Sequence, residues 1–118
     1  MNQFKFLALF LFLSLSIVSC SKDDTGPTIT ITAPAEGAIL IRGQEYSIEG
    51  TVTDDTEIAT INAGGLNISP LDSKTKHTFK NLKLPIPLTA VVGNGTFTIT
   101  ATDKESNQTT KVVNFKIQ

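Results

Sequence analysis

A strict two-residue alternation of apolar and polar side chains recurs after Pro27 and limits what this chain can fold into. The clearest case is residues 96–102, where Phe97, Ile99 and Ala101 alternate with four threonines. Successive side chains of a β-strand point to opposite faces of a sheet, so the pattern predicts a strand with one buried face. No helical periodicity extends over about ten residues in this region, and we therefore predict an all-β domain.

Similar runs are separated by turn-forming residues along the rest of the chain. We expect extended segments at residues 28–33, 38–41, 45–53, 57–63, 66–69, 76–86, 96–102 and 108–117. Segment 57–63 departs from strict alternation, which predicts a β-bulge or a strand covered on both faces. Strands with turns about every 8–12 residues are typical of an antiparallel β-sandwich, here of about seven strands. The inward positions include all the aromatic residues of this region, Tyr46, Phe79, Phe97 and Phe115.

The path of the chain before residue 96 is open to two interpretations. Asn94-Gly95 between apolar runs is a strong hairpin signal and would place residues 88–92 beside residues 96–102. A sandwich would instead carry the chain across to the second sheet. Pro85 and Pro87 lack the backbone N–H that a central strand donates, which favours the crossover.

The first residues have the layout of a secretory signal. Lys5 is followed by an apolar run, residues 6–18, interrupted only by two serines. The run is shorter than the roughly 20 residues that a membrane-spanning helix needs. We therefore predict a signal peptide at residues 1–19, a tether at residues 20–26 and one domain at residues 27–118.

Cys20 is the only cysteine, so no disulfide can form within the chain. The run Ile17-Val18-Ser19-Cys20 resembles the lipobox of bacterial lipoproteins. The resemblance implies that diacylglycerol is joined to the Cys20 sulfur, that cleavage precedes Cys20, and that the new amine is acylated. Several acyl chains, each stabilising by ~0.8 kcal/mol per buried CH₂, would give stable anchoring to the membrane. The alternative is an ordinary signal with an unrelated cysteine.

The run Ser21-Lys22-Asp23-Asp24 is similar to the surface-export tag of Bacteroidetes-type lipoproteins. The resemblance implies an outer-membrane location with the domain displayed at the cell surface. So polar a run cannot bury itself and would stay an extended, solvated tether. The alternative is a polar linker that faces the periplasm.

Three groups of residues in the predicted domain carry a second resemblance. They are Pro27-Thr28-Ile29-Thr30-Ile31 with Pro34 and Gly37, Ile48-x-Gly50-x-Val52-x-Asp54, and Gly95-x-Phe97-x-Ile99-x-Ala101-x-Asp103 with Asn107. This pattern resembles a bacterial immunoglobulin-like (Ig-like) domain, as in the small Ig-like lipoproteins of Bacteroidetes, and implies an Ig-like sandwich from about Pro27 to Gln118. Ser106 departs from the family, which usually has glycine before the asparagine, and this leaves the last turn open.

The inventory of reactive side chains predicts a protein that is not an enzyme and holds no cofactor apart from the lipid. His77 is the only histidine, we expect it on the surface of a strand, and no G-x-S-x-G motif accompanies it. A zinc site needs three or four ligands, which the sequence does not supply. A net charge of −1 and no basic cluster argue against nucleic acid as a partner.

The acidic loops are the best candidate for a binding site. In an Ig-like sandwich, the loop after the second long strand and the last hairpin loop share one pole, which would gather Asp54, Asp55, Asp103 and Asn107. Oxygen ligands from several loops are what Ca²⁺ takes. The alternative is that Asp54, Asp103 and Asn107 cap their own turns.

The function that these features favour is a lipid-anchored binding or interaction module, whose partners are the membrane and an unknown protein or glycan. Loops carry function on such scaffolds. The candidate residues are Asp54, Asp55, Thr56, Gly93, Asn94, Gly95, Asp103, Lys104 and Glu105. The alternative is a structural spacer or one subunit of a larger outer-membrane complex. An exposed apolar patch would favour binding, and a uniformly polar surface would favour the spacer.

Overall fold

The computed structural model describes residues 25–118, which form nine strands and no helix. The strands are β1 (Thr28–Ala33), β2 (Ala38–Leu40), β3 (Glu45–Thr53), β4 (Ile58–Ala63), β5 (Leu66–Asn67), β6 (Lys76–Thr78), β7 (Leu82–Pro85), β8 (Gly93–Asp103) and β9 (Gln108–Ile117). The predicted signal peptide, Cys20 and the run Ser21–Asp24 lie outside the described residues. Within the described range, no helix is long and apolar enough to cross a membrane.

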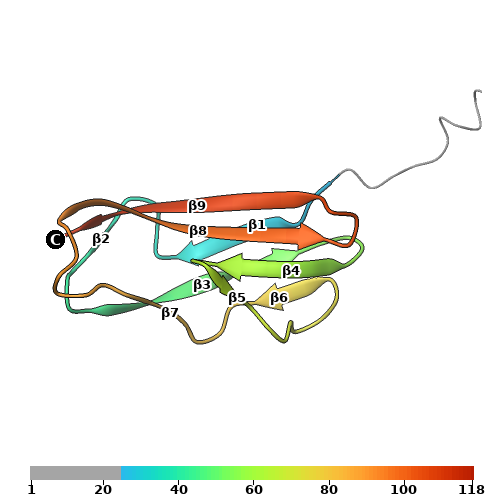
Figure 1. The fold of residues 1–118 in the computed structure, drawn as a ribbon, viewed down its shortest axis with the longest axis horizontal. Helices are drawn as coiled ribbons and strands as arrows, with labels where there is room; N and C mark the ends of the chain where they lie inside the picture. The colour runs from blue at the N-terminus through green and yellow to red at the C-terminus, as the bar shows by residue number, and fades with distance from the viewer. Residues whose placement is uncertain (1–24) are drawn as a thin grey trace, which may run out of the picture.

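Two sheets pack face to face, as Figure 1 shows. One has the order β1-β3-β6, with β7 also paired to β3, and the other has the order β2-β9-β8-β4-β5. This confirms the predicted β-sandwich. One pairing differs from the antiparallel expectation, because β2 runs parallel to β9.

The predicted extended segment 76–86 is divided into two strands that pair with successive parts of β3. The break includes Asn81, whose φ of 57° lies in the left-handed region and cannot continue a strand. This division, together with the short strands β2 and β5, explains why nine strands form where about seven were expected. The predicted β-bulge in segment 57–63 is confirmed by a register shift between Ile58 and Thr60.

The chain crosses between the sheets after β7, as Pro85 and Pro87 favoured. Strand β7 pairs with β3, whereas β8 pairs with β4 and β9 in the other sheet. The hairpin alternative is wrong. Asn94 and Gly95 lie inside β8, where they pair with Lys116 and Phe115 of β9.

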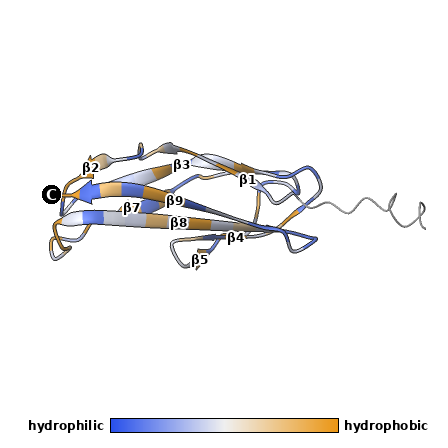
Figure 2. Cartoon of the chain, turned by 90° about the horizontal axis from the view of Figure 1, so that it is seen from above, coloured by the Kyte–Doolittle hydropathy of each residue, from blue (hydrophilic) through white to orange (hydrophobic). Residues whose placement is uncertain are grey.

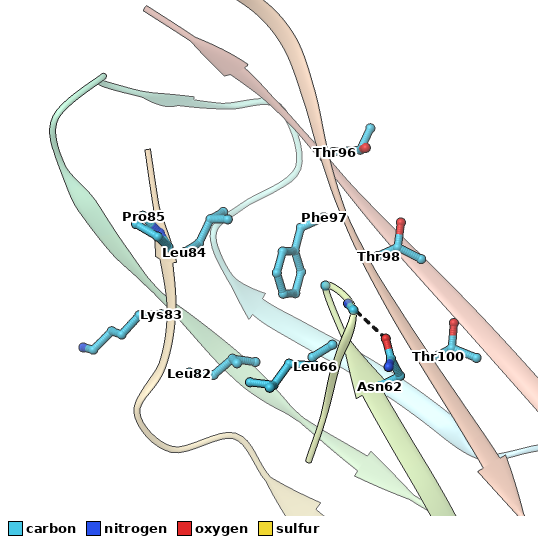
Figure 3. Close-up of a pocket in the computed structure, with 13 residues that line it drawn as sticks. Asn62, Leu66, Leu82, Lys83, Leu84, Pro85, Thr96, Phe97, Thr98 and Thr100 are labelled. Atoms are coloured by element: carbon cyan, nitrogen blue, oxygen red, sulfur yellow. Dashed lines mark hydrogen bonds between the residues drawn. The ribbon is translucent and has the colours of Figure 1, made fainter. Parts of the chain in front are cut away.

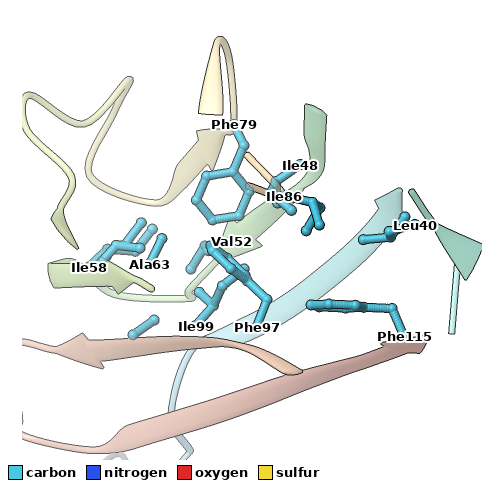
Figure 4. Close-up of a cluster of buried hydrophobic side chains, with 12 residues drawn as sticks. Leu40, Ile48, Val52, Ile58, Ala63, Phe79, Ile86, Phe97, Ile99 and Phe115 are labelled. Atoms are coloured by element: carbon cyan, nitrogen blue, oxygen red, sulfur yellow. The ribbon is translucent and has the colours of Figure 1, made fainter. Parts of the chain in front are cut away.

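The core lies between the sheets and is built from the inward positions of each strand (Figure 4). Phe97, Ile99 and Ala101 of β8 are buried, as their alternation with threonine predicts. Opposite them lie Ile48 and Val52 of β3, which are also buried. A slip of one residue in either strand would turn these side chains to solvent, so the alternation also fixes the register.

The long strands give the domain two poles that are about 35 Å apart, since β8 has 11 residues at ~3.3 Å each. We call the near pole the end where the chain leaves residue 25 and where loops 54–57 and 104–107 lie. The far pole carries loops 41–44 and 86–92 and the last residue, Gln118. Figure 1 shows the two poles at opposite ends of the long axis.

Candidate functional site

The acidic side chains of the near pole cap their own turns. Asp54 Oδ2 accepts hydrogen bonds from the Thr56 backbone N–H (3.2 Å) and hydroxyl (2.9 Å). Asp103 Oδ1 accepts from the backbone N–H groups of Glu105 (2.9 Å) and Asn107 (2.8 Å), and Oδ2 accepts from Asn107 Nδ2 (3.1 Å). The turn-cap interpretation is therefore confirmed for these residues.

The predicted calcium ligands are not gathered into a cation site. Among residues 25–118, no group of three His, Cys, Asp or Glu side chains lies close enough to hold a metal. Asp103 is only 1% exposed, and its oxygens are directed at its own loop. Asp54 and Asp55 instead border a small hollow of about 50 Å³ beside Thr25.

The electrostatics of Asp103 follow from its burial and its hydrogen bonds. Burial raises its pKa, but hydrogen bonds from the Asn107 side chain and from the Asn107 and Glu105 backbones lower it by more. The net pKa of Asp103 therefore lies below its usual value, and the carboxylate form holds the turn together. This turn also joins β8 to β9, so its charge state matters to the whole sheet.

Ser106 stands where the resemblance to bacterial Ig-like domains implies glycine, and its backbone has the conformation that favours glycine. Its φ is 68°, in the left-handed region that glycine adopts without steric cost. Its backbone N–H donates to the Asp103 carbonyl (3.1 Å), so the turn needs this conformation whatever residue is present. The turn therefore forms with serine at this position.

Lys104 is tied down by a neighbouring loop. Its Nζ lies 2.5 Å from Glu57 Oε2, and its backbone N–H donates to the Glu57 carbonyl (3.0 Å). Lys74 approaches the other oxygen of Glu57 at 3.7 Å. Of the predicted interaction residues, Lys104 thus braces the near pole rather than extending freely from it.

Gly93, Asn94 and Gly95 lie at the far pole and not beside the acidic loops. They form the first residues of β8 and pair with β9. Gly95 leaves room for the ring of Phe115, which a side chain at this position would meet. The predicted interaction residues therefore belong to two surfaces at opposite ends of the domain.

His77 is buried, and the prediction of a surface histidine is wrong. It is 7% exposed, its ring meets Phe79 edge-on at 5.5 Å between centroids, and its Nδ1 accepts from the Asp72 backbone N–H (3.2 Å). The sequence could have indicated this burial, because His77 and Phe79 are two residues apart in an extended segment and therefore lie on the same face. The neighbouring lysines suggested an exposed strand, although they lie on its other face or beyond its end.

An exposed apolar patch lies at the far pole, and sequence reasoning missed it. We call Ile41, Leu88, Val91 and Val92 the far-pole patch. Leu88 is 76% exposed and Val91 84% exposed. The Leu88 side chain lies over Gly43, which joins the two loops of this pole. Figure 2 shows hydrophobic segments at the end that carries the C-terminus.

A groove of about 540 Å³ opens along the side of the sandwich between β7 and the β4–β5 turn. Phe97, Leu84 and Leu82 point into it from the two sheets, and Leu66 lies at its rim (Figure 3). A second hollow of about 220 Å³ adjoins it, because Leu66 and Leu82 line both. The alternation of side chains did not predict this groove, which exists because β4 ends before β8 does.

Comparisons with known proteins agree with this fold. Residues 27–80 match the family model described as a bacterial Ig domain. A solved structure titled "Structures of Clostridium thermocellum CbhA fibronectin(III)-like modules" is similar over 77% of this chain, with a TM-score of 0.54 and 19% identity. This chain spans 46% of that one, and at 19% identity the likeness shows the fold alone. No curated protein matches the sequence. The described residues thus have an immunoglobulin-like fold, and residues 27–80 are similar to bacterial Ig domains.

We predict that Asp103→Asn weakens the acid dependence of stability. An aspartate of the unfolded chain titrates near pH 3.9. Because the folded pKa of Asp103 is lower, its carboxylate stabilises the fold above about pH 3.9, and this stabilisation is lost as the pH falls through the folded pKa. The variant should have a lower free energy of unfolding at neutral pH and a shallower decline toward about pH 2, measured by urea unfolding. The exposed substitution Asp55→Asn controls for the loss of one charge, and an unchanged acid slope in Asp103→Asn would contradict the prediction.

We predict that Ser106→Gly stabilises the domain by about 0.5–1 kcal/mol, since it removes the steric cost of a left-handed serine. Urea unfolding at neutral pH measures the gain. Ser47→Gly, in the extended strand β3, is the matched control and should destabilise by about 0.5–1 kcal/mol. Equal losses in the two variants would contradict the assignment of strain to Ser106.

Proposed function

We propose that this protein is a non-enzymatic binding module, held at the bacterial outer membrane by lipid on Cys20 and displayed at the cell surface. The lipobox-like run at Cys20 and the tag-like run Ser21–Asp24 support the location. The bacterial Ig domain match supports a modular, scaffold-type role. The membrane is then one partner, reached through the lipid, and a surface protein is the other.

The far-pole patch is the observation that carries the binding role. An anchored chain enters the domain at the near pole, so this patch lies at the end farthest from the anchor. Isolated exposed apolar residues are common, but several gathered at one place mark an interaction surface. The spacer alternative would instead be expected to present a polar surface at this pole.

The position of the aromatic residues favours a protein partner over a glycan. Sugar-binding surfaces stack exposed aromatic rings on the sugar. Phe79, Phe97 and Phe115 are buried, and the Tyr46 hydroxyl accepts from the Ile41 backbone N–H at 2.8 Å. In the described part of the chain, all four aromatic residues thus belong to the core or pack against it.

The environment of His77 supports a role without catalysis. A histidine base must present a ring nitrogen to a nucleophile or to a bound substrate. His77 is buried, and its Nδ1 already accepts from the backbone of Asp72. The acidic group with the clearest pKa shift at the near pole, Asp103, likewise serves its own turn.

We predict that Cys20→Ser abolishes lipid attachment and releases the protein from the membrane fraction. The serine hydroxyl cannot replace the thiol that receives the lipid. Metabolic labelling with a fatty acid and fractionation of the cells measure both effects. Ser21→Ala, one residue away, should keep both the label and the membrane location. A labelled, membrane-bound Cys20→Ser protein would contradict the anchor.

We predict that the double variant Leu88→Ser, Val91→Ser loses contact with the partner at the cell surface. Truncating two central apolar contacts should reduce crosslinked adducts on intact cells by about tenfold or more. Its free energy of unfolding should change by only about 0.5 kcal/mol, because both side chains are exposed. Val112→Ser, another exposed apolar residue on β9, is the control. Equal adduct yields from the unmodified protein, the double variant and Val112→Ser would contradict the far-pole patch as the binding surface.

A further inference from the structure

We infer that His77 and the second hollow form a binding site for a small, uncharged, apolar molecule that carries a carbonyl oxygen. The hollow has a volume of about 220 Å³ and lies between β5, with the segment that follows it, and the break between β6 and β7. His77 and Phe79 are its buried residues, whereas its other polar residues are exposed at the rim. The site shares no residue with the far-pole patch and needs no lipid on Cys20, so it goes beyond the proposed function.

The imidazole of His77 presents a hydrogen-bond donor that the fold does not use. Its Nδ1 accepts from the Asp72 backbone N–H (3.2 Å), so the hydrogen of the neutral ring is on Nε2. Among the described residues, none bonds with Nε2. The side chain is only 8% exposed, yet no fully buried side-chain nitrogen or oxygen in the described range lacks a partner, so Nε2 must have an opening. His77 borders the second hollow, and we therefore place its Nε2–H at the floor of that hollow.

A donor in this position suits an acceptor oxygen on a ligand. A hydrogen bond in a largely water-excluded site is electrostatically stronger than one at an exposed surface. Because Nδ1 is already bonded and Nε2 carries the hydrogen, His77 donates here and does not accept a proton from the ligand. This role agrees with a binding site and not with a catalytic base.

The walls of the hollow are apolar and supply contacts for a short hydrocarbon chain. The Phe79 ring lies beside His77, and Leu66 is 61% exposed at the rim. Ile68 follows β5 and Leu82 begins β7, so each sheet contributes one half-buried wall. Leu66 and Leu82 also line the larger groove (Figure 3), which leaves room for a longer chain. Apolar walls with a few placed polar groups are typical of small-molecule sites.

Charges around the hollow cancel, and this favours an uncharged ligand. Lys80 is the charged residue among those that line it, and its Nζ lies 3.8 Å from Asp72 Oδ2. The same carboxylate oxygen lies 3.8 Å from His77 Nδ1 and accepts from the Thr78 backbone N–H (2.9 Å). An anion at Nε2–H would be repelled by the Asp72 carboxylate, and a cation would meet Lys80 and the ring N–H. A carbonyl oxygen takes the hydrogen bond without either cost.

The test uses the isotope-labelled full chain in detergent and 2-hexanone, which joins a short alkyl chain to one carbonyl. NMR titration should shift the Nε2–H signal of His77 and the amide signals of Ile68 and Leu82, but not that of Val112 on β9. We expect a dissociation constant on the order of 1 mM, which is within reach of so small a molecule. Hexanoate and hexylammonium should each bind about tenfold more weakly. No shift of the hollow signals, the result of a hollow that holds water only, or equal binding of the three probes would overturn the proposal.

Two variants test the donor and the charge selection. His77→Asn keeps an acceptor near the place of Nδ1, and thus the contact with Asp72, but removes the Nε2–H. It should weaken 2-hexanone binding about fivefold to tenfold, the effect of one hydrogen bond. Thr78→Asn, on the outer face of β6, is its control and should bind as the unmodified protein does. Asp72→Asn removes the charge that opposes an anion and should recover most of the tenfold loss of hexanoate.

The outcomes separate the parts of the proposal. Equal 2-hexanone binding by the unmodified protein and His77→Asn would overturn His77 as the donor. Hexanoate binding that stays equally weak in Asp72→Asn would overturn the selection for an uncharged ligand. If His77→Asn does not fold, the Nε2–H signal and the order of the three probes in the unmodified protein decide the result. Variants of Leu88 and Val91 leave this site intact, so the far-pole patch and the hollow are tested independently.

Discussion

The antiparallel pairing of β8 with β9 is the interaction on which the rest of the structure depends. The two strands stay in register over ten residue pairs, from Gly93–Ile117 to Thr102–Gln108. They occupy the middle of their sheet, with β2 beyond β9 and β4 beyond β8. Their inward side chains, among them Ile99, Val113 and Phe115, form one wall of the core. With a single cysteine in the chain, no disulfide within it can replace this pairing.

The two ends of this strand pair have different properties, and the candidate functions follow from them. At the near pole, buried Asp103 closes the β8–β9 turn with three hydrogen bonds, so its loop is a structural element. At the far pole, the crossover from β7 leaves Leu88 and Val91 in water. The acidic side chains that the sequence offered as binding residues thus stabilise their own turns, and the apolar loop at the far pole is the better candidate for binding.

A mismatch in strand length is the origin of the groove. Strand β8 extends six residues beyond Ile99, which is the last of its residues to pair with β4 and lies opposite Ala63. The two glycines after Ala63 turn the chain away, and the backbone of Thr96 is left at an open edge above Phe97. Natural sheets usually protect such edges, and here the β4–β5 turn covers only part of this one.

The sequence by itself determined the strands and their buried faces, because the two-residue alternation of β8, β3 and β9 leaves one solution for which side chains meet the core. It also indicated the crossover, since Pro85 and Pro87 cannot donate to a ladder. Only the tertiary structure decided how far neighbouring strands run beside each other, and hence where the groove lies and that β2 is parallel to β9. It also decided that Asp103 caps its turn rather than joining Asp54 and Asp55, and that His77 is buried beside Phe79. The physical reason is that alternation reports which face of a strand is covered, whereas strand ends and loop contacts depend on partners distant in sequence.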